Sequence, residues 1–556
     1  MPQIPPPNLL SCLGLENCST PSFAMSDSVP SDVIGRRIDV NGELGTVRYF
    51  GNVPPVKGPW IGVEWDNPLR GKHDGSHEGT IYFKCRHPTG GSFIRPNRVN
   101  FGVDFLTAIK NRYGLENTKE EDGNEMIVIG NKPVETVGFD SIKKFQSQLN
   151  RLQEVSVWSS AVSCAGNKGE IAQTCPNIRR IDLSKNLLSS WNEVISIAAQ
   201  LKYLEVLNLS ENKLKFLYDS PSPSFTFSAL KVLVLNRTGI TWTEVLWHAK
   251  GWPVLEELYL ASNDITISER PTDTLQTLKL LDLSNNQPID GDQLFQIAYL
   301  PRLEQLILSD NRISALHFPD VGLGCKTSMF PSLQYLVING NQISQWSSIN
   351  ELDKLQSLQS LSCTQNPLTG GSKEPQTIRQ LIIAKIGQLK ILNKCEILPE
   401  ERRGAELDYR KAFGNEWKKA GGHQDPDKNK PNNEFIIAHP RYQLLCLKYG
   451  APEDGELKPQ QPFMLKNQLL TLTIKCLNQP DQKTLVKQLP ESMTIQKVKG
   501  LLSRLLKVPG SELKLSYESP KVSRFNKTHN QILTFFIDNN IYDQRTLFRI
   551  LKATNL

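Results

Sequence analysis

The sequence lacks an apolar run long enough to cross a membrane. Such a span needs about 18 consecutive apolar residues, and no run of that length occurs in the 556 residues. The first 24 residues have no basic region, and Ser11 and Cys12 interrupt their apolar run, so they do not resemble a secretory signal. We therefore expect no membrane partner, and a disordered leader rich in proline and serine over residues 1–30.

Cysteines are few and scattered. The chain has 10 of them, and no two have C-x-x-C spacing. A disulfide framework is therefore not indicated. Several cysteines, such as Cys363, occupy an apolar position of a sequence repeat, which is typical of reduced thiols that fill a core. The cysteine usage thus favours a cytoplasmic protein.

Long blocks of one charge are also missing. The 64 Lys and Arg against 57 Asp and Glu leave a net charge of +7, which is spread along the chain. A nucleic-acid surface requires clustered basic residues, so we expect no nucleic-acid partner. The mild positive charge still allows attraction to acidic proteins.

Catalytic motifs are absent as well. No G-x-G-x-x-G, G-x-S-x-G or H-E-x-x-H occurs. The pair Gly71-Lys72 fails as a phosphate-binding loop, because His73 follows it and Asp66 stands where that loop needs its first glycine. Four residues could surround a zinc ion, although their spacing matches no usual frame: His73, His77, Cys85 and His87. We predict a protein that is not an enzyme and needs neither cofactor nor metal.

What the sequence has instead is an internal repeat. The pattern L-x-x-L-x-L-x-x-N occurs at residues 178–186, 204–212, 255–263, 278–286, 303–311 and 333–341. Two variant copies complete the series: residues 230–238 end in Thr238, and residues 358–366 carry Cys363 at the third apolar position. Successive ninth positions lie 23 to 30 residues apart, which is typical of leucine-rich repeats.

This spacing predicts a solenoid. The three apolar residues face inward on a short parallel strand, and the asparagine binds the backbone of the following turn. Each coil can bury its apolar edge only against the next coil, so the repeats must stack. We expect an α/β horseshoe over residues 171–370 and a cap over residues 371–420. Residues 102–170 are predicted to connect the horseshoe to the preceding domain.

Residues between the strand leucines point to the concave face of such a solenoid. Apolar side chains at these positions suggest a protein partner, although they could instead pack on one another across neighbouring strands. Val206 and Val232 belong to this face, together with polar neighbours such as Glu257. The predicted partner-binding set is Val234, Tyr259, Leu280, Ile307, Tyr335 and Val337.

The residues after the cap form three stretches. Residues 421–434 are polar and rich in Pro, Gly and Asn, so we predict a flexible linker over residues 421–462. Residues 463–520 contain a strand-like alternation, an amphipathic helical pattern and a second strand-like run. The tail, residues 521–556, is atypical and shows no closing strand. We therefore expect the small sheet to keep an open edge.

Residues 31–101 alternate short β-like runs with Gly, Pro and Asn, which predicts a small β-barrel. The segments GTVRYFG, GPWIGVEWD, GKHDGSHEGTIYF and GGSFIRPNRV resemble a CAP-Gly domain in order and spacing. The resemblance implies binding of acidic protein tails that end in an aromatic residue, such as the C-terminal tail of tubulin. Asp74 and Ser76 are expected to shape the glycine-rich loop rather than to touch the ligand.

The resemblance also implies roles for individual side chains. Lys72 would attract the acidic groups of the tail or its terminal carboxylate. Trp60 and Phe93 would wall a slot for the terminal ring, unless both simply fill the barrel core. His73 stands where the family usually has asparagine, which would make binding sensitive to pH. The full predicted set is Trp60, Lys72, His73, Gly75, Ser76, Phe93 and Arg95.

A CAP-Gly domain followed by leucine-rich repeats and a ubiquitin-like segment resembles the tubulin-folding cofactor E family, from about Met25 to Pro520. This implies a multidomain α+β chaperone that captures α-tubulin and, with other tubulin-folding cofactors, assembles or dissociates the α/β heterodimer at the cytoskeleton. The ubiquitin-like β-grasp domain would be incomplete and could recruit the proteasome. Two alternatives stay open: a microtubule-end CAP-Gly adaptor, although no coiled coil is visible, and a proteasome shuttle.

Overall fold

The computed structural model describes most of the chain between residues 29 and 552. The chain divides into two units, residues 1–453 and residues 454–556. No helix in the described part has both the length and the apolar character that crossing a membrane requires. The described ranges are 29–114, 127–129, 132–134, 148–215, 226–322, 324–368, 375–457, 469–476, 485–490, 493, 495–507, 509, 513–518 and 547–552.

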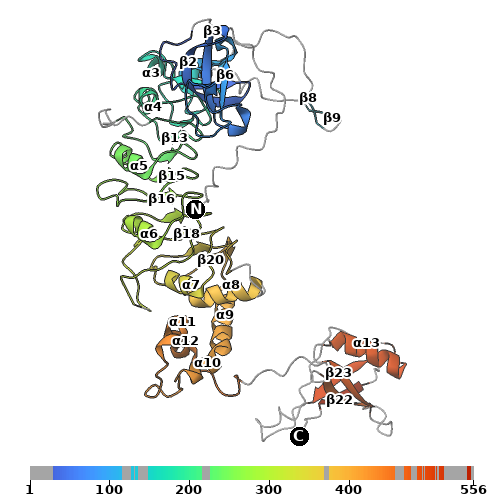
Figure 1. The fold of residues 1–556 in the computed structure, drawn as a ribbon. Helices are drawn as coiled ribbons and strands as arrows, with labels where there is room; N and C mark the ends of the chain where they lie inside the picture. Colours follow the sequence, from blue (N-terminus) through green and yellow to red (C-terminus); the bar gives the residue numbers. More distant parts are fainter. Residues whose placement is uncertain are drawn as a thin grey trace. The chain divides into compact units, whose positions relative to one another are not determined.

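An antiparallel sheet with the strand order β1-β2-β3-β6 organises the first domain (Figure 1). Its strands are β1 (Arg37–Val40), β2 (Glu43–Val53), β3 (Val56–Trp65) and β6 (Gly91–Ile94). The hairpin of β4 and β5 and two 3-10 turns complete the domain: β4 (Ser76–His77), β5 (Thr80–Ile81), η1 (Pro68–Arg70) and η2 (Pro96–Arg98). Its core contains Val33, Ile38, Val40, Val47, Ile61, Val63, Trp65 and Val99.

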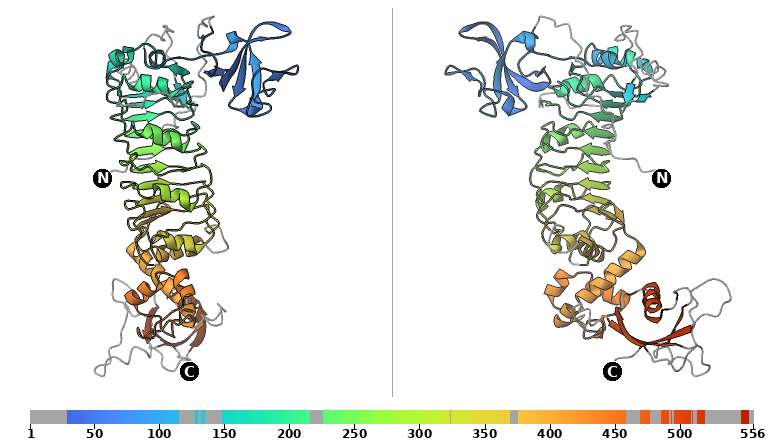
Figure 2. Two further views of the ribbon diagram at one scale, coloured as in Figure 1. Left: turned by 60° about the vertical axis from the view of Figure 1, so that its left-hand side comes forward. Right: turned by 90° about the vertical axis from the view of Figure 1, so that its right-hand side faces the viewer.

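An eleven-stranded sheet follows, in which the neighbours from β10 to β20 are parallel and follow chain order (Figure 2). Strands β12 to β19 coincide with the eight predicted repeat copies, so the solenoid is confirmed. The strands are β10 (Glu154–Ser156), β12 (Arg180–Asp182), β13 (Val206–Asn208), β14 (Val232–Val234), β15 (Glu257–Tyr259), β16 (Leu280–Asp282), β17 (Gln305–Ile307), β18 (Tyr335–Val337), β19 (Ser360–Ser362), β20 (Ile391–Leu392) and β21 (Cys395–Glu396).

Buried asparagines hold successive coils together. The side-chain amide of Asn286 donates to the carbonyl oxygens of Leu283 and Leu260, at 2.8 and 3.0 Å. Its Oδ1 accepts the backbone N–H groups of Asn263 and Ile265, at 2.9 and 3.0 Å. One side chain thus satisfies backbone groups of two adjacent coils, which must otherwise lose their water when the coils stack. The same position is buried at Asn186, Asn212, Asn263, Asn286, Asn311, Asn341 and Asn366.

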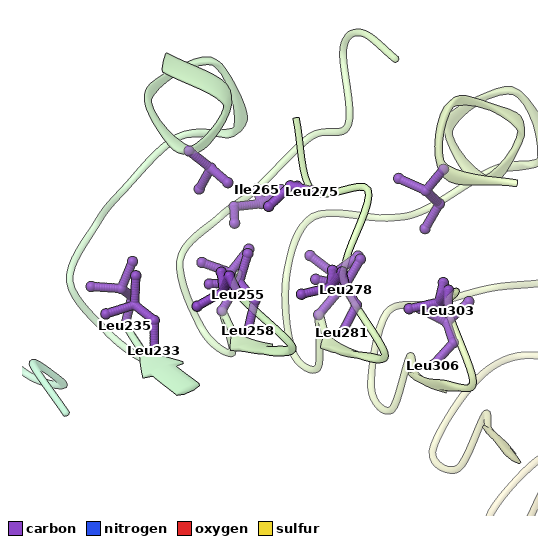
Figure 3. Close-up of a cluster of buried hydrophobic side chains, with 14 of the residues drawn as sticks. Leu233, Leu235, Leu255, Leu258, Ile265, Leu275, Leu278, Leu281, Leu303 and Leu306 are labelled. Atoms are coloured by element: carbon purple, nitrogen blue, oxygen red, sulfur yellow. The ribbon is translucent and has the colours of Figure 1, made fainter. Parts of the chain in front are cut away.

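The inward leucines form continuous layers between coils (Figure 3). Leu258, Leu281 and Leu306 lie in register on adjacent strands, and each is at most 1% exposed. Removing one such side chain typically costs about 2–5 kcal/mol of unfolding free energy. Short helices complete several coils (Figure 1): α3 (Glu170–Thr174), α4 (Trp191–Ala198), α5 (Trp242–Ala249), α6 (Gly291–Ile297), α7 (Trp346–Leu352) and α8 (Pro375–Lys385).

The solenoid begins earlier than predicted. Strand β10 extends the sheet by pairing with β12, and Phe105 and Ile109 of α1 are fully buried in the solenoid core. Residues 102–170 therefore do more than connect two domains, because the first coil needs a cover for its apolar edge. The elements are β7 (Val103–Asp104), α1 (Phe105–Tyr113), β8 (Ile127–Ile129), β9 (Lys132–Val134), η4 (Leu149–Arg151) and β11 (Val162–Cys164).

The other end carries a larger cap than predicted. Residues 421–462 contain two packed helices in their described part, so the prediction of a flexible linker is wrong there. Glu406, which is 1% exposed, accepts hydrogen bonds from Lys448 and Tyr449, both at 2.8 Å, and thereby holds α12 against α9. The cap helices are α9 (Pro399–Ala412), α10 (Gly414–Lys419), α11 (Asn433–Ala438) and α12 (Tyr442–Tyr449).

The second unit has a four-stranded sheet with the order β23-β22-β25-β24. Strand β25 lies in the tail and pairs antiparallel with β22 and parallel with β24. The expectation that the tail supplies no strand is therefore wrong, although a ubiquitin-like fold for this unit stays a prediction. The elements are β22 (Leu469–Cys476), β23 (Leu485–Pro490), α13 (Ile495–Leu506), β24 (Lys514–Glu518) and β25 (Leu547–Lys552).

Candidate protein-binding surfaces

The glycine-rich loop of residues 71–79 lies against strand β6. The backbone N–H of Lys72 donates to the carbonyl oxygen of Gly91 at 2.7 Å, and the N–H of Gly91 donates to the carbonyl of His73 at 2.6 Å. These bonds place the exposed Lys72 beside the strand that carries Phe93. A cation on a fixed loop can attract a carboxylate without the cost of first ordering that loop.

Gly75 shapes this loop. Its φ of +105° is one that other residues rarely adopt, and a Cβ added there would lie 2.1 Å from the carbonyl oxygen of Phe83. The carbonyl of Gly75 also accepts the N–H of Tyr82 at 3.1 Å. The position therefore requires glycine, because the loop and the segment after β5 approach each other backbone to backbone.

Asp74 and Ser76 stabilise the loop from within. The hydroxyl and the backbone N–H of Ser76 both donate to Oδ1 of Asp74, at 2.5 and 3.0 Å. The hydroxyl bond, followed by the backbone bond, lowers the pKa of the Asp74 carboxyl. Ser76 thus uses its hydroxyl inside the loop, and its predicted contact with a ligand stays a prediction.

Aromatic rings surround Phe93. The ring centroids of Tyr82, Phe83 and Tyr49 lie 5.4, 5.6 and 6.2 Å from the Phe93 centroid, each in an edge-on arrangement. Edge-on pairs at such distances are favourable beyond the area that they bury. Sequence reasoning identified Phe93 and missed the other three rings.

Gly62 makes room for this cluster. It pairs with Tyr49 on one neighbouring strand and with Phe93 on the other, and a Cβ there would lie 2.4 Å from Cε1 of Phe83. The signal available in the sequence was therefore a glycine inside a strand, which often marks a place that another group occupies.

His73 closes one side of the cluster. Its ring stacks on Phe93 with centroids 4.9 Å apart, and its Nδ1 accepts the N–H of Gly75 at 3.0 Å. Burial lowers the pKa of His73, and His77 adds to this effect while Asp74 opposes it. The neutral ring therefore fits the loop, since protonation at Nδ1 removes the acceptor.

Trp60 and Arg95 form a second group next to the cluster. The guanidinium of Arg95 lies 3.8 Å from the centroid of the Trp60 ring and donates to the carbonyls of Pro59 and Lys57, at 3.1 and 2.9 Å. Trp60 precedes the strand partner of Phe93 by two residues, so both side chains lie on one face of the sheet. Both are partly exposed and lie outside the buried core of the domain.

Side chains of the zinc cluster that the sequence suggested make other contacts. Nδ1 of His73 binds Gly75, and Nδ1 of His87 lies 2.9 Å from Oγ1 of Thr89. Burial raises the pKa of the Cys85 thiol to about 11, which disfavours the thiolate that zinc needs. Among the residues that the structure describes, no group of three or more His, Cys, Asp or Glu side chains is arranged to hold a metal ion.

The predicted partner-binding residues occupy the outward positions of the solenoid sheet. In strands β14 to β18 the central leucine is buried and the flanking side chains are more exposed, up to 42% at Tyr335. The parallel register aligns these side chains in two rows. One row is Val232, Glu257, Leu280, Gln305 and Tyr335, and the other is Val234, Tyr259, Asp282, Ile307 and Val337.

Polar groups interrupt the apolar rows near their middle. The Tyr259 hydroxyl donates to Glu257 at 2.9 Å. Asp282 lies between Tyr259 and Ile307 in the same row, and burial raises its pKa although Ser284 opposes this with two hydrogen bonds. A face of this mixed character suits a folded protein better than a purely apolar ligand.

Alternating charges border the rows at the start of the strands. Glu205 lies between Arg179 at 2.8 Å and Lys231 at 3.7 Å, and Glu256 binds Lys279 at 3.0 Å. Exposed pairs of this kind contribute little to stability. Their charges can instead select among partners that approach the face.

Known protein families match two regions of the chain, and individual known proteins match most of its length. The CAP-Gly domain family matches residues 34–99, and a leucine-rich repeat family matches residues 244–420. Tubulin-specific chaperone E of Bos taurus is 76% identical over 499 residues, which cover 90% of this chain and 94% of that protein. The Homo sapiens protein of the same name is 74% identical over 501 residues, with 89% and 94% covered. Tubulin-folding cofactor E of Arabidopsis thaliana is 29% identical over 536 residues, with 93% and 97% covered.

Proposed function

Because the chain belongs to the tubulin-specific chaperone E family, we propose that it captures α-tubulin through two surfaces at once. The surface formed by Lys72 and the aromatic rings around Phe93, the tail site, takes the acidic C-terminal tail. The outward face of the solenoid sheet holds the folded body. Joining two weak sites in one chain can raise the overall affinity by about 10²–10⁴ when the geometry permits both contacts.

One observation supports the tail site: the loop, held by hydrogen bonds, lies beside a wall of aromatic rings. The stack of His73 on Phe93, at 4.9 Å, closes the wall on the side of the loop, and Trp60 under Arg95 extends it along β6. A terminal aromatic ring can pack against such a wall while its carboxylate meets Lys72. Little has to be ordered on binding, because hydrogen bonds already hold the loop.

The support for the body site is the chemistry of the two outward rows. Apolar and aromatic side chains from five adjacent strands lie side by side, and acids interrupt them. Tyr259 is one such aromatic anchor, and aromatic residues are enriched among the positions that dominate binding energy at protein interfaces. Tyr335, at 42% exposed, offers another.

The rest of the proposed function follows from the family. With other tubulin-folding cofactors, the protein promotes the assembly or the dissociation of the α/β-tubulin heterodimer in the cytoplasm, close to the cytoskeleton. We assign no catalytic step to this chain, and the work comes from binding energy alone. The second unit is our candidate for recruiting another cofactor or the proteasome.

The test of the tail site compares two lysines of the same domain. Lys72→Ala should weaken the binding of a peptide that ends in Glu-Glu-Tyr by tenfold or more, on the order of one charge-assisted hydrogen bond. Lys84, which is also exposed, provides the control, and Lys84→Ala should leave the affinity unchanged. Calorimetry measures both, and equal affinities for the two variants would remove Lys72 from the site.

The same preparation tests the body site. Changing Tyr259 and Ile307 to aspartate should abolish the capture of α-tubulin that lacks its tail and leave the peptide affinity intact. Tyr299→Asp is the control, because Tyr299 is 40% exposed and lies in the turn before β17, away from the two rows. Capture by the double variant at the level of this control would show that the sheet face does not hold the body.

A further inference from the structure

The link between the CAP-Gly domain and the solenoid is one residue long. Phe101 packs against the core of the CAP-Gly domain, and Val103 packs against the core of the solenoid and pairs with Val162. Gly102 alone stands between them, with a φ of +88°, and a Cβ there would lie 2.3 Å from the carbonyl oxygen of Ala161. Such a link leaves the two domains little freedom to turn.

A second contact lies far away in the sequence. Nζ of Lys213, in the turn after β13, donates to Oδ1 of Asp66 in the CAP-Gly domain at 2.7 Å. The buried Arg37, which is 2% exposed, holds the same carboxylate at 2.8 Å and so fixes its direction. Burial acts to raise the pKa of Asp66, but the bonds from Arg37 and Lys213 lower it overall.

One more lysine of the solenoid lies against the same domain. Lys215 lies so close to Gly35 that a Cβ added at Gly35 would be 2.0 Å from its Nζ. The segment after β13 therefore directs two cations, Lys213 and Lys215, at the CAP-Gly domain.

We propose that Lys213 and Lys215 form a clasp that fixes the CAP-Gly domain on the first repeats in one orientation. Together with the one-residue link, the clasp presents the tail site and the outward sheet face to the same partner in a set geometry. This consequence rests on the proposed capture of α-tubulin, whereas the clasp itself does not. The clasp adds pre-organisation, which lowers the cost of the second contact once the first is made.

The expected effect of the clasp is modest. The side chains of Lys213 and Asp66 are 46% and 29% exposed, and an ion pair in such a setting changes an equilibrium by about fivefold at most. Opening the clasp should therefore weaken the two-site capture of intact α-tubulin by about two- to fivefold. Binding of the tail peptide alone uses only the tail site and should not change.

A zero-length cross-link tests the contact directly. A carbodiimide joins an amine to a carboxylate only where the two touch, so treatment of the full chain followed by mass spectrometry should yield a peptide pair that joins Lys213 to Asp66. Lys326 and Asp353, 3.6 Å apart within the solenoid, provide the internal control. Formation of the control link without the link from Lys213 to Asp66 would overturn the proposal.

The consequence for binding is tested with Lys213→Glu. This variant should bind intact α-tubulin about two- to fivefold more weakly and the tail peptide with unchanged affinity, while Lys326→Glu should change neither. Loss of peptide affinity in Lys213→Glu, or unchanged α-tubulin affinity, would overturn the inferred role of the clasp. If neither the variants nor the unaltered chain binds α-tubulin, the proposed function fails. The cross-link alone then decides whether the clasp exists.

Discussion

Replacing Gly75 by alanine tests whether the glycine-rich loop is built by close backbone packing. The added methyl group meets two obstacles. The φ of +105° is unfavourable for any residue with a Cβ, and that Cβ would lie 2.1 Å from the carbonyl oxygen of Phe83. Gly79, in the same loop, has a φ of +79° but no atom within 4 Å of an added Cβ. The two glycines therefore separate the backbone strain from the steric overlap.

The magnitudes follow from these two geometries. A left-handed backbone costs a residue with a Cβ about 1–2 kcal/mol, and this is the whole expected loss for Gly79→Ala. Overpacking against a backbone atom adds about 1–3 kcal/mol. Gly75→Ala should therefore destabilise the loop by roughly 2–5 kcal/mol, and it should also weaken peptide binding, because the displaced loop carries Lys72.

Amide hydrogen exchange measures the effect within the intact chain. Exchange reports local opening free energies, which is necessary because a protein with several domains has no single unfolding transition. The amides of Tyr82 and Phe83, which both donate to the carbonyl of Gly75, should lose more protection in Gly75→Ala than in Gly79→Ala. Equal losses of protection and of peptide affinity in the two variants would refute the argument from the Phe83 carbonyl.

Two further predictions concern the solenoid and the loop. Asn286→Ala leaves the backbone N–H groups of Asn263 and Ile265 without their acceptor and should cost roughly 3–5 kcal/mol of local opening free energy, whereas the exposed Gln287→Ala should cost under about 0.5 kcal/mol. Equal protection of these two amides from hydrogen exchange in the two variants would contradict the role of the buried asparagines. Because the pKa of His73 lies below its ordinary 6.5, its neutral ring contributes stability that is full above pH 6.5 and is lost as the pH falls through the folded pKa. The difference in the local opening free energy of the loop between the unaltered chain and His73→Asn, measured by amide hydrogen exchange, should therefore shrink from pH 7 to pH 5, and a constant difference would exclude this role.

The solenoid could be predicted from the sequence because its signal is local and periodic. Within each copy, the same spacing places leucines on the inward side and an asparagine in the turn. Leu258, Leu281 and Leu306 form one buried row. Each of them can be recognised from the residues next to it in the sequence. The first coil escaped prediction because β10 lacks the repeat pattern and is recognised only by its pairing with β12.

The cap helices α11 and α12 could not be predicted because their packing depends on contacts distant in sequence. Gly422 reads as part of a polar, flexible stretch, but a Cβ there would lie 2.2 Å from the ring of Trp417. Glu406 is buried although it is charged, since Lys448, Tyr449 and Arg441 surround it at 2.8, 2.8 and 3.2 Å. Polar composition indicated a linker, whereas the polar groups form a buried network.

The candidate tail site was predicted only in part for a related reason. Lys72 and Gly75 belong to one contiguous motif, which identifies the loop by itself. Tyr49 reaches Phe93 only through the pairing of three strands, and that register is not evident before the sheet is known. The motif thus locates the candidate site, and the tertiary structure supplies the rings that surround Phe93.

The outward rows of the sheet carry more information about function than the inward leucines do. Leucines and asparagines recur because every coil must bury an apolar edge and satisfy its backbone. The stacking of coils makes no such demand on Tyr259 or Ile307, since these side chains lie on the other face of their strands, whereas Asp282 accepts two hydrogen bonds from Ser284 in its own turn. Burial of Asp282 between two apolar neighbours even works against ionisation of its carboxyl. Apolar side chains that the stacking of coils does not require, grouped in the middle of one face, are the reason why we propose that a protein binds there.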